Sequence, residues 1–117
     1  MNVLVVEDNI DIGDAVSSHI VADGHCVDWC VNLKDAACRL TSKKYDLVLV
    51  DLGLPDGNGL SLLRAIRREG DKTPVIIMTA QDQYSDRLAG MKGGADDFLV
   101  KPFDLDELSS RMRRVKQ

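Results

Sequence analysis

The sequence predicts an α/β protein in which five strand–helix units build a doubly wound, five-stranded parallel sheet. Short apolar runs recur along the chain, and each is nearly continuous rather than alternating, which is typical of parallel strands buried on both faces. Segments with the helical repeat separate these runs. Alternation of this kind requires right-handed crossover connections between neighbouring strands. The 117 residues suit a single domain, residues 1–117.

Four apolar runs predict strands of the sheet, and they lie at residues 3–6, 47–50, 75–78 and 98–100. A fifth candidate, residues 25–31, mixes polar and apolar side chains, so we expect it at an edge of the sheet. Pro74 stands directly before the run at 75–78, where a strand tolerates a missing backbone N–H.

The segments between the strands carry apolar residues at helical spacing. These stripes are Ile12, Ala15, Val16 and Ile20; Leu33, Ala36, Ala37 and Leu40; Leu62, Leu63 and Ile66; and Leu105, Leu108 and Met112. Gly24 and Gly70 follow two of the helical segments, where a left-handed residue is needed to end a helix. Asp104, with Glu107 three residues later, predicts a capping box at the start of the last helix. Residues 84–92 have the weakest periodicity, so we expect the helix there to be the least firmly packed.

Composition and charge narrow the class of protein. Hydrophobic residues make up 44% of the chain and charged residues 29%, a balance typical of a soluble globular protein. No apolar run approaches the roughly 18 residues that a membrane span needs, and the first residues lack the pattern of a signal peptide. We therefore expect a cytoplasmic protein that does not bind a membrane. The net charge of −4 argues against direct contact with nucleic acid, which requires a basic face.

The three cysteines, Cys26, Cys30 and Cys38, form no CxxC pair and have no histidine at zinc-site spacing. We expect reduced thiols that are mostly buried as small hydrophobic side chains.

Polar side chains follow these four predicted strands at the point where each strand ends. They are Glu7 and Asp8, Asp51, Thr79 and Lys101. Because the carboxyl ends of parallel strands meet at one edge of a sheet, and ligands bind there, we expect these side chains to converge. Each alone has an ordinary interpretation, since a strand-end aspartate usually forms a turn or a helix cap. Their joint position at matching strand ends favours a functional site.

Three carboxylates in one crevice repel one another, and the ammonium group of Lys101 balances only one of them. The sequence therefore predicts a bound cation. Carboxylate oxygens in an incomplete set suit Mg²⁺, which keeps some of its waters and accepts a phosphate oxygen. An aspartate can act as a nucleophile toward phosphorus, and a hydroxyl group and an ammonium group suit the remaining phosphoryl oxygens.

Four fragments carry a resemblance to a known family. They are VLVVEDN at 3–9, DLVLVDLGLPDGNGL at 46–60, PVIIMTA at 74–80 and GADDFLVKPF at 94–103. Together they resemble the receiver domain of two-component response regulators over the whole chain. The last fragment, followed by DLDEL, is most similar to the winged-helix (OmpR/PhoB-type) transcriptional-regulator subfamily.

The resemblance implies a flavodoxin-like (βα)5 fold with strand order 2-1-3-4-5, and it implies roles for individual residues. Asp51 would be the phosphorylated residue, with a sensor histidine kinase as donor. Asp8, Asp51 and the backbone carbonyl of Gly53 would bind Mg²⁺, with Mn²⁺ as an acceptable substitute, and Glu7 would act through water or by shaping the acidic pocket. Lys101 would pair with the phosphoryl group, and its bond to Pro102 would be cis. Thr79 would move to bond the phosphate and let Phe98 swing inward.

Two positions depart from the commonest pattern of the family. Phe98 stands where tyrosine is more frequent, so a switch that uses a tyrosine hydroxyl is excluded. Gly53 stands where many receivers carry a side chain that affects how water reaches the phosphoaspartate. Together with Gln81, it leaves the lifetime of the phosphorylated state open.

The resemblance also implies an output surface. In the winged-helix subfamily, activated receivers pair through the fourth helix, the fifth strand and the fifth helix, and Arg87, Asp97, Glu107 and Arg111 match the charged positions of that interface. The alternative is that they are ordinary surface charges. We expect a homodimer on phosphorylation and DNA contact only through a C-terminal winged-helix domain that is absent from this chain. A stand-alone receiver acting through protein contacts is the other alternative.

Two rival functions share parts of this pattern. A phosphohydrolase of the haloacid-dehalogenase type needs a second acid two residues after its nucleophile, where this chain has Gly53. A flavodoxin-like nucleotide binder needs a phosphate-binding loop after the first strand, where this chain has Glu7 and Asp8. We therefore expect a phosphoaccepting signalling domain that assists its own phosphorylation and dephosphorylation, rather than an enzyme.

Overall fold

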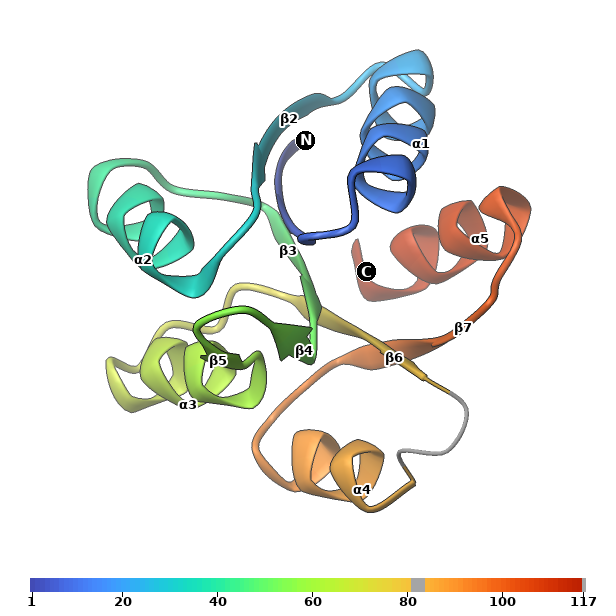
Figure 1. Ribbon diagram of the computed structural model, residues 1–117. Coiled ribbons are helices and arrows are strands. Elements are labelled where there is room, and N and C mark those ends of the chain that lie inside the picture. The colour runs from blue at the N-terminus through green and yellow to red at the C-terminus, as the bar shows by residue number, and fades with distance from the viewer. Residues whose placement is uncertain (81–83, 117) are drawn as a thin grey trace.

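The computed structural model describes residues 1–80 and 84–116, and the side chains of residues 1–80 and 88–115 (Figure 1). The five strands of the central sheet alternate with helices along the chain, as the apolar runs predict. The elements are β1 (Asn2–Val6), α1 (Ile10–Ala22), β2 (Cys26–Cys30), α2 (Leu33–Ser42), β3 (Leu47–Asp51), β4 (Gly53–Leu54), β5 (Gly57–Asn58), α3 (Leu60–Arg68), β6 (Val75–Ala80), α4 (Tyr84–Lys92), β7 (Asp97–Lys101) and α5 (Leu105–Lys116).

Five parallel strands form the central sheet in the order β2-β1-β3-β6-β7. The short strands β4 and β5 pair with each other in a separate antiparallel hairpin. Counted among the strands of the central sheet, this is the predicted order 2-1-3-4-5. The predicted edge strand is also confirmed, because β2 lies at one end of the sheet. Polar residues in β2 are tolerated because an edge strand is only half covered.

Helices cover both faces of the sheet (Figure 1). The helices α1 and α5 pack through Val16, Ile20, Leu108 and Met112 on one face, while α2, α3 and α4 cover the other. The side chains of residues 3–6 in β1 and 47–50 in β3 are fully buried between these layers, which explains their continuous apolar runs. Among the described residues, no helix has both the length and the apolar character needed to cross a bilayer.

Local sequence signals set the helix ends. The side chain of Asn9 accepts the N–H of Ile12 at 3.1 Å, and the side chain of Asp104 accepts the N–H of Glu107 at 2.8 Å. Gly24 and Gly70 adopt φ angles of +93° and +76°, as the predicted helix ends require. The predicted helix over 84–92 is α4, and it presents Leu88 and Met91 to solvent.

Two details of the sequence prediction are wrong. Ala15 and Ala37 are exposed, although the helical stripes place them on the inner faces. All three cysteines are free thiols, as expected, but Cys26 and Cys38 are exposed and only Cys30 is buried. Cys26 is exposed because it begins the edge strand β2.

The connection between α4 and β7 is anchored to α3 by one arginine. The guanidinium group of Arg67 donates to the carbonyl oxygen of Gly94 at 2.9 Å, to that of Thr73 at 2.8 Å, and to the carboxylate of Asp96 at 3.1 Å. The carboxylate of Asp96 also accepts the N–H of Val75 at 2.8 Å, which ties the anchor to the start of β6.

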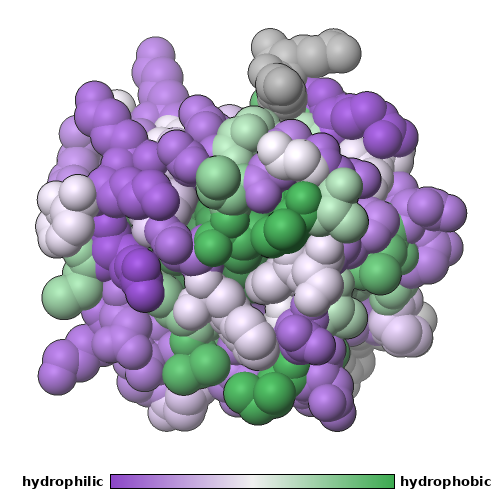
Figure 2. Space-filling view, turned by 90° about the horizontal axis from the view of Figure 1, so that it is seen from above, coloured by the Kyte–Doolittle hydropathy of each residue, from purple (hydrophilic) through white to green (hydrophobic). Residues whose placement is uncertain are grey.

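The face that carries α1 and β2 has an apolar centre (Figure 2). Val21 on this face is 56% exposed, and a shallow groove runs beside it. The groove is lined by Ser17, Ser18, Val21, Ala22, Val27 and Trp29. Part of the Trp29 ring therefore borders solvent, while the rest packs inward against the cluster between α1, α5 and the sheet.

Candidate functional site

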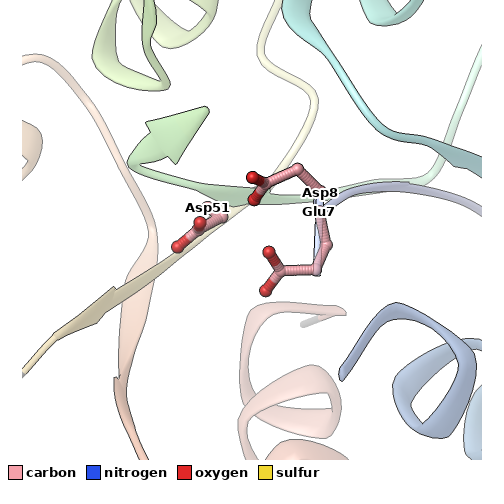
Figure 3. A group of neighbouring side chains, drawn as sticks. All are labelled: Glu7, Asp8 and Asp51. Carbon is pink, nitrogen blue, oxygen red and sulfur yellow. The ribbon is translucent and has the colours of Figure 1, made fainter. Parts of the chain in front are cut away.

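Three carboxylates meet at the carboxyl edge of the sheet, as the sequence predicts (Figure 3). Glu7 and Asp8 follow β1, and Asp51 is the last residue of β3. One carboxylate oxygen of each lies within 4.8 Å of the others. Glu7 is 1% exposed and Asp51 is 8% exposed, whereas Asp8 is open to solvent. The acidic cluster of Glu7, Asp8 and Asp51 is therefore fixed on one side and accessible on the other.

Lys101, the last residue of β7, joins this cluster. Its ammonium group lies 2.5 Å from Oε1 of Glu7 and 3.1 Å from Oδ1 of Asp51. Burial lowers the pKa of Lys101, but the hydrogen bond that its ammonium group donates to Glu7 and the charge of Asp51 outweigh burial and raise the pKa above its ordinary value. Burial raises the pKa of Glu7, against the opposing hydrogen bond from Lys101. The Lys101–Pro102 peptide bond is cis, as the resemblance implies.

Thr79 and Phe98 occupy neighbouring strands beside the acidic cluster. Thr79 is fully buried in β6, one residue beyond Met78, which pairs with Asp51. Its hydroxyl group donates to the carbonyl oxygen of Ala80 at 3.3 Å. Phe98 of β7 is half-buried and packs against the core between the sheet and helices α2, α3 and α4. Gln81 lies outside the described residues.

The chain after β3 passes close behind Asp51. Gly53 opens the β4–β5 hairpin, is exposed, and has nothing within 4 Å of the point where a Cβ would stand. Gly59 closes the hairpin, and a Cβ there would lie 2.3 Å from the carbonyl oxygen of Asp51. Sequence reasoning missed both the hairpin and Gly59, because strands of two residues leave no periodic signal.

The acidic cluster fits a hard divalent cation. Three carboxylates face one ammonium group, so a cation is needed to balance them when all are ionised. The donors are oxygen atoms, which suit Mg²⁺ or Mn²⁺, and the exposed Asp8 leaves space for water and a phosphate oxygen. Glu7 already binds Lys101 and accepts the N–H of Asn9 at 3.3 Å. It is therefore less available than Asp8 or Asp51 as a direct ligand.

Three of the four predicted dimer-face residues form one ion-pair network within the chain. The guanidinium group of Arg111 lies 2.9 Å from the carboxylate of Asp97 and 3.5 Å from that of Glu107. The side chain of Arg87 lies outside the described side chains. Leu88 and Met91 of α4 are 48% and 47% exposed.

One residue near the acidic cluster has no counterpart in the sequence prediction. The indole N–H of Trp29 donates to the backbone carbonyl of Glu7 at 2.9 Å. A lone tryptophan in a predicted edge strand of mixed polarity is the only sequence signal that could have singled it out.

Comparison with known proteins agrees with this geometry. The model of the response regulator receiver domain family matches residues 3–113. The response regulator protein PmrA of Pseudomonas aeruginosa is 42% identical over 115 residues, which cover 98% of this chain and 52% of that protein. The swarming motility regulation protein RssB of Serratia marcescens is 42% identical over 117 residues, which cover 100% of this chain and 53% of that protein. The chain thus spans about half the length of the curated relatives it matches.

Solved structures show the same likeness. The receiver domain of the Francisella response regulator 1452 is 32% identical, with a TM-score of 0.91, and the match covers 98% of this chain and 95% of that one. The non-phosphorylated HemR receiver domain from Leptospira biflexa is 35% identical, with a TM-score of 0.90, covering 99% and 94%. The regulators among the relatives, PmrA and PhoP of Pseudomonas aeruginosa included, confirm the expected likeness to the winged-helix subfamily. The chain belongs to the response regulator receiver domain family.

Proposed function

We propose that Asp51 accepts a phosphoryl group from a phosphohistidine of a sensor histidine kinase. The observation that supports this most directly is the place of Asp51 in the acidic cluster, 8% exposed and 3.1 Å from the ammonium group of Lys101. In the transfer, a carboxylate oxygen of Asp51 attacks phosphorus and forms a P–O bond. The P–N bond to the kinase imidazole breaks, and its electron pair leaves with the imidazole nitrogen.

Asp8, Asp51 and the backbone carbonyl of Gly53 would hold Mg²⁺ or Mn²⁺, and Glu7 would act through a bound water. The cation, when bound, neutralises charge on the carboxylates and on the phosphoryl oxygens. Lys101 would exchange its contact with Asp51 for a phosphoryl oxygen, and its raised pKa keeps it charged for that task. The hydroxyl group of Thr79 would bind another phosphoryl oxygen, after which Phe98 moves inward.

Phosphorylation would then change the face formed by α4, β7 and α5 and promote a homodimer. In the described structure Arg111 is satisfied within its own chain by Asp97 and Glu107. Dimerisation would exchange these pairs for contacts between two chains, with Arg87 taking part. The phosphoryl group would act by favouring the arrangement of α4 that pairs better. A fully phosphorylated chain that still sediments as a monomer would overturn this step.

The relatives are about twice as long as this chain, which supports a role within a larger protein. We propose a cytoplasmic transcription regulator, in which this receiver controls a winged-helix domain that binds the DNA. The receiver itself would touch neither DNA nor membrane. It would assist its own phosphorylation and dephosphorylation rather than turn over an external substrate.

The decisive experiment is incubation with acetyl phosphate and Mg²⁺, followed by measurement of the intact mass. We expect one added phosphoryl group, which is lost when EDTA is present and in the variant Asp51→Asn. The control is Asp106→Asn, an exposed aspartate in the first turn of α5 that should leave the added mass unchanged. If the Asp51→Asn variant gains the same added mass as the parent chain, Asp51 is not the phosphoryl acceptor.

A further inference from the structure

The backbone of Glu7 is held on both sides by the edge strand β2. The N–H of Glu7 donates to the carbonyl oxygen of Cys30 at 2.9 Å. The carbonyl oxygen of Glu7 accepts the indole N–H of Trp29, also at 2.9 Å. Because its carboxylate binds Lys101, Glu7 is fixed through its side chain and through both of its backbone groups.

Helix α1 leaves space for the indole ring that makes this contact. A Cβ at Gly13 would lie 2.1 Å from Cζ2 of Trp29 and 2.3 Å from Cε2, closer than any real contact. Gly13 stands inside α1, where glycine is a poor helix former. The missing side chain therefore lets Trp29 cross the helix and reach the turn that carries Glu7 and Asp8.

We propose that Trp29 is a positioning residue for the metal ligands, acting through the backbone of Glu7. This inference rests on the proposed function, in which Asp8 binds the cation. Asp8 is exposed, so packing of its side chain does little to hold it. The position of Asp8 depends on the peptide bond that joins it to Glu7, and the hydrogen bond from Trp29 holds the carbonyl group of that peptide bond. Residues that contact the ligands of a metal, without binding the metal themselves, orient those ligands and affect the affinity for the metal.

The variant Trp29→Phe tests this role, because phenylalanine keeps an aromatic ring but lacks the N–H donor. Mn²⁺ serves as the probe, and its free concentration is read by electron paramagnetic resonance. We expect Trp29→Phe to bind Mn²⁺ about tenfold more weakly than the parent chain. In the metal-free protein, we also expect the amide protons of Asp8 and Asn9 to exchange faster.

The matched control is Val27→Ala, two residues earlier on the same face of β2 and packed against the same apolar cluster. This variant should lower the stability of the domain yet leave Mn²⁺ affinity unchanged, because a merely structural contact does not act on the ligands. An equal loss of affinity in Val27→Ala would overturn the positioning role.

A second variant, Gly13→Ala, should displace the indole and weaken Mn²⁺ binding in the same way. Combining it with Trp29→Phe should weaken binding little further, since both changes act through one hydrogen bond. Fully additive losses would count against the inference. If the parent chain binds Mn²⁺ and Trp29→Phe binds it equally well, the inference alone fails. If the parent chain binds no Mn²⁺, the proposed function fails as well.

Discussion

At the scale of single residues, Tyr45 and Asp28 form a pair with a measurable titration. The phenol of Tyr45 donates to the carboxylate of Asp28 at 2.6 Å. Burial, and then this hydrogen bond, raise the pKa of Tyr45 from its ordinary value of 10.0 to about 12. The neutral phenol therefore stabilises the fold fully at pH values below 10.0, and this stabilisation is lost as pH rises toward 12. We expect ultraviolet titration of a Tyr84→Phe variant to show this pKa, and Asp28→Asn to lower it. A midpoint that does not move in Asp28→Asn would contradict this account.

Lys101 gives a second prediction at this scale, since removing it leaves the carboxylates of Glu7 and Asp51 without their shared cation. We expect Lys101→Met to lower the free energy of unfolding at pH 8 by roughly 2 kcal/mol, less than for a fully buried pair because Lys101 is 21% exposed. The loss should shrink at pH 5. Burial raises the pKa of Glu7, so that without Lys101 the folded protein holds a proton on Glu7 at low pH. This proton removes the unpaired charge and stabilises the fold, and the stabilisation is lost as pH rises and Glu7 ionises.

Urea unfolding at the two pH values measures this difference. The control is Lys43→Met, whose exposed ion pair with Asp28 should be worth less than about 1 kcal/mol at pH 8. Equal losses at both pH values for Lys101→Met would show that Glu7 does not titrate as described.

At the scale of elements, α4 and α3 differ in how they are packed. The helix α3 buries Leu62, Leu63 and Ile66, whereas α4 leaves Leu88 and Met91 about half exposed, at 48% and 47%. Local opening should therefore cost less for α4. We expect its amide protons to exchange at least about tenfold faster than those of α3 in native-state hydrogen exchange. Equal protection of the two helices would contradict this reading of their burial.

Some features of the fold and of the candidate site can be predicted from the sequence, and others cannot. Asp51 could be placed from sequence because parallel strands bring their carboxyl ends together, whatever packs around them. The prediction that Ala15 lies on the inner face of α1 is wrong because burying an alanine gains little free energy. The larger apolar side chains of the helix therefore decide which of its faces packs against the sheet. The contacts of Trp29 with Glu7 and of Gly59 with Asp51 join residues that no local pattern links, and only the folded chain reveals them.

At the scale of the whole molecule, we expect repulsion among the three carboxylates of the acidic cluster to lower the stability of the metal-free protein. We expect Asp8→Asn to raise the melting temperature of the metal-free protein, since Asp8 forms part of the crowded carboxylate cluster. With Mg²⁺ at about 100 times its dissociation constant, the parent chain should gain about 2.7 kcal/mol and overtake the variant. Thermal unfolding with and without Mg²⁺ measures both. A variant that stays below the parent chain in the absence of metal would refute the repulsion.

The Arg67 anchor has a mechanical consequence for α4. Because Arg67 binds the carbonyl of Gly94 and the carboxylate of Asp96, the chain just after α4 is clamped to α3. With its C-terminal end held in this way, α4 cannot shift along its axis, and its N-terminal end can move only by rotation about the held end. We therefore expect any displacement of α4 to be a rotation about Gly93 and Gly94, largest at Tyr84 and smallest at Lys92. Removing the contact with Arg67→Ala should free the C-terminal end of α4 as well, so we expect the amide proton of Lys92 to exchange faster in this variant than in the parent chain.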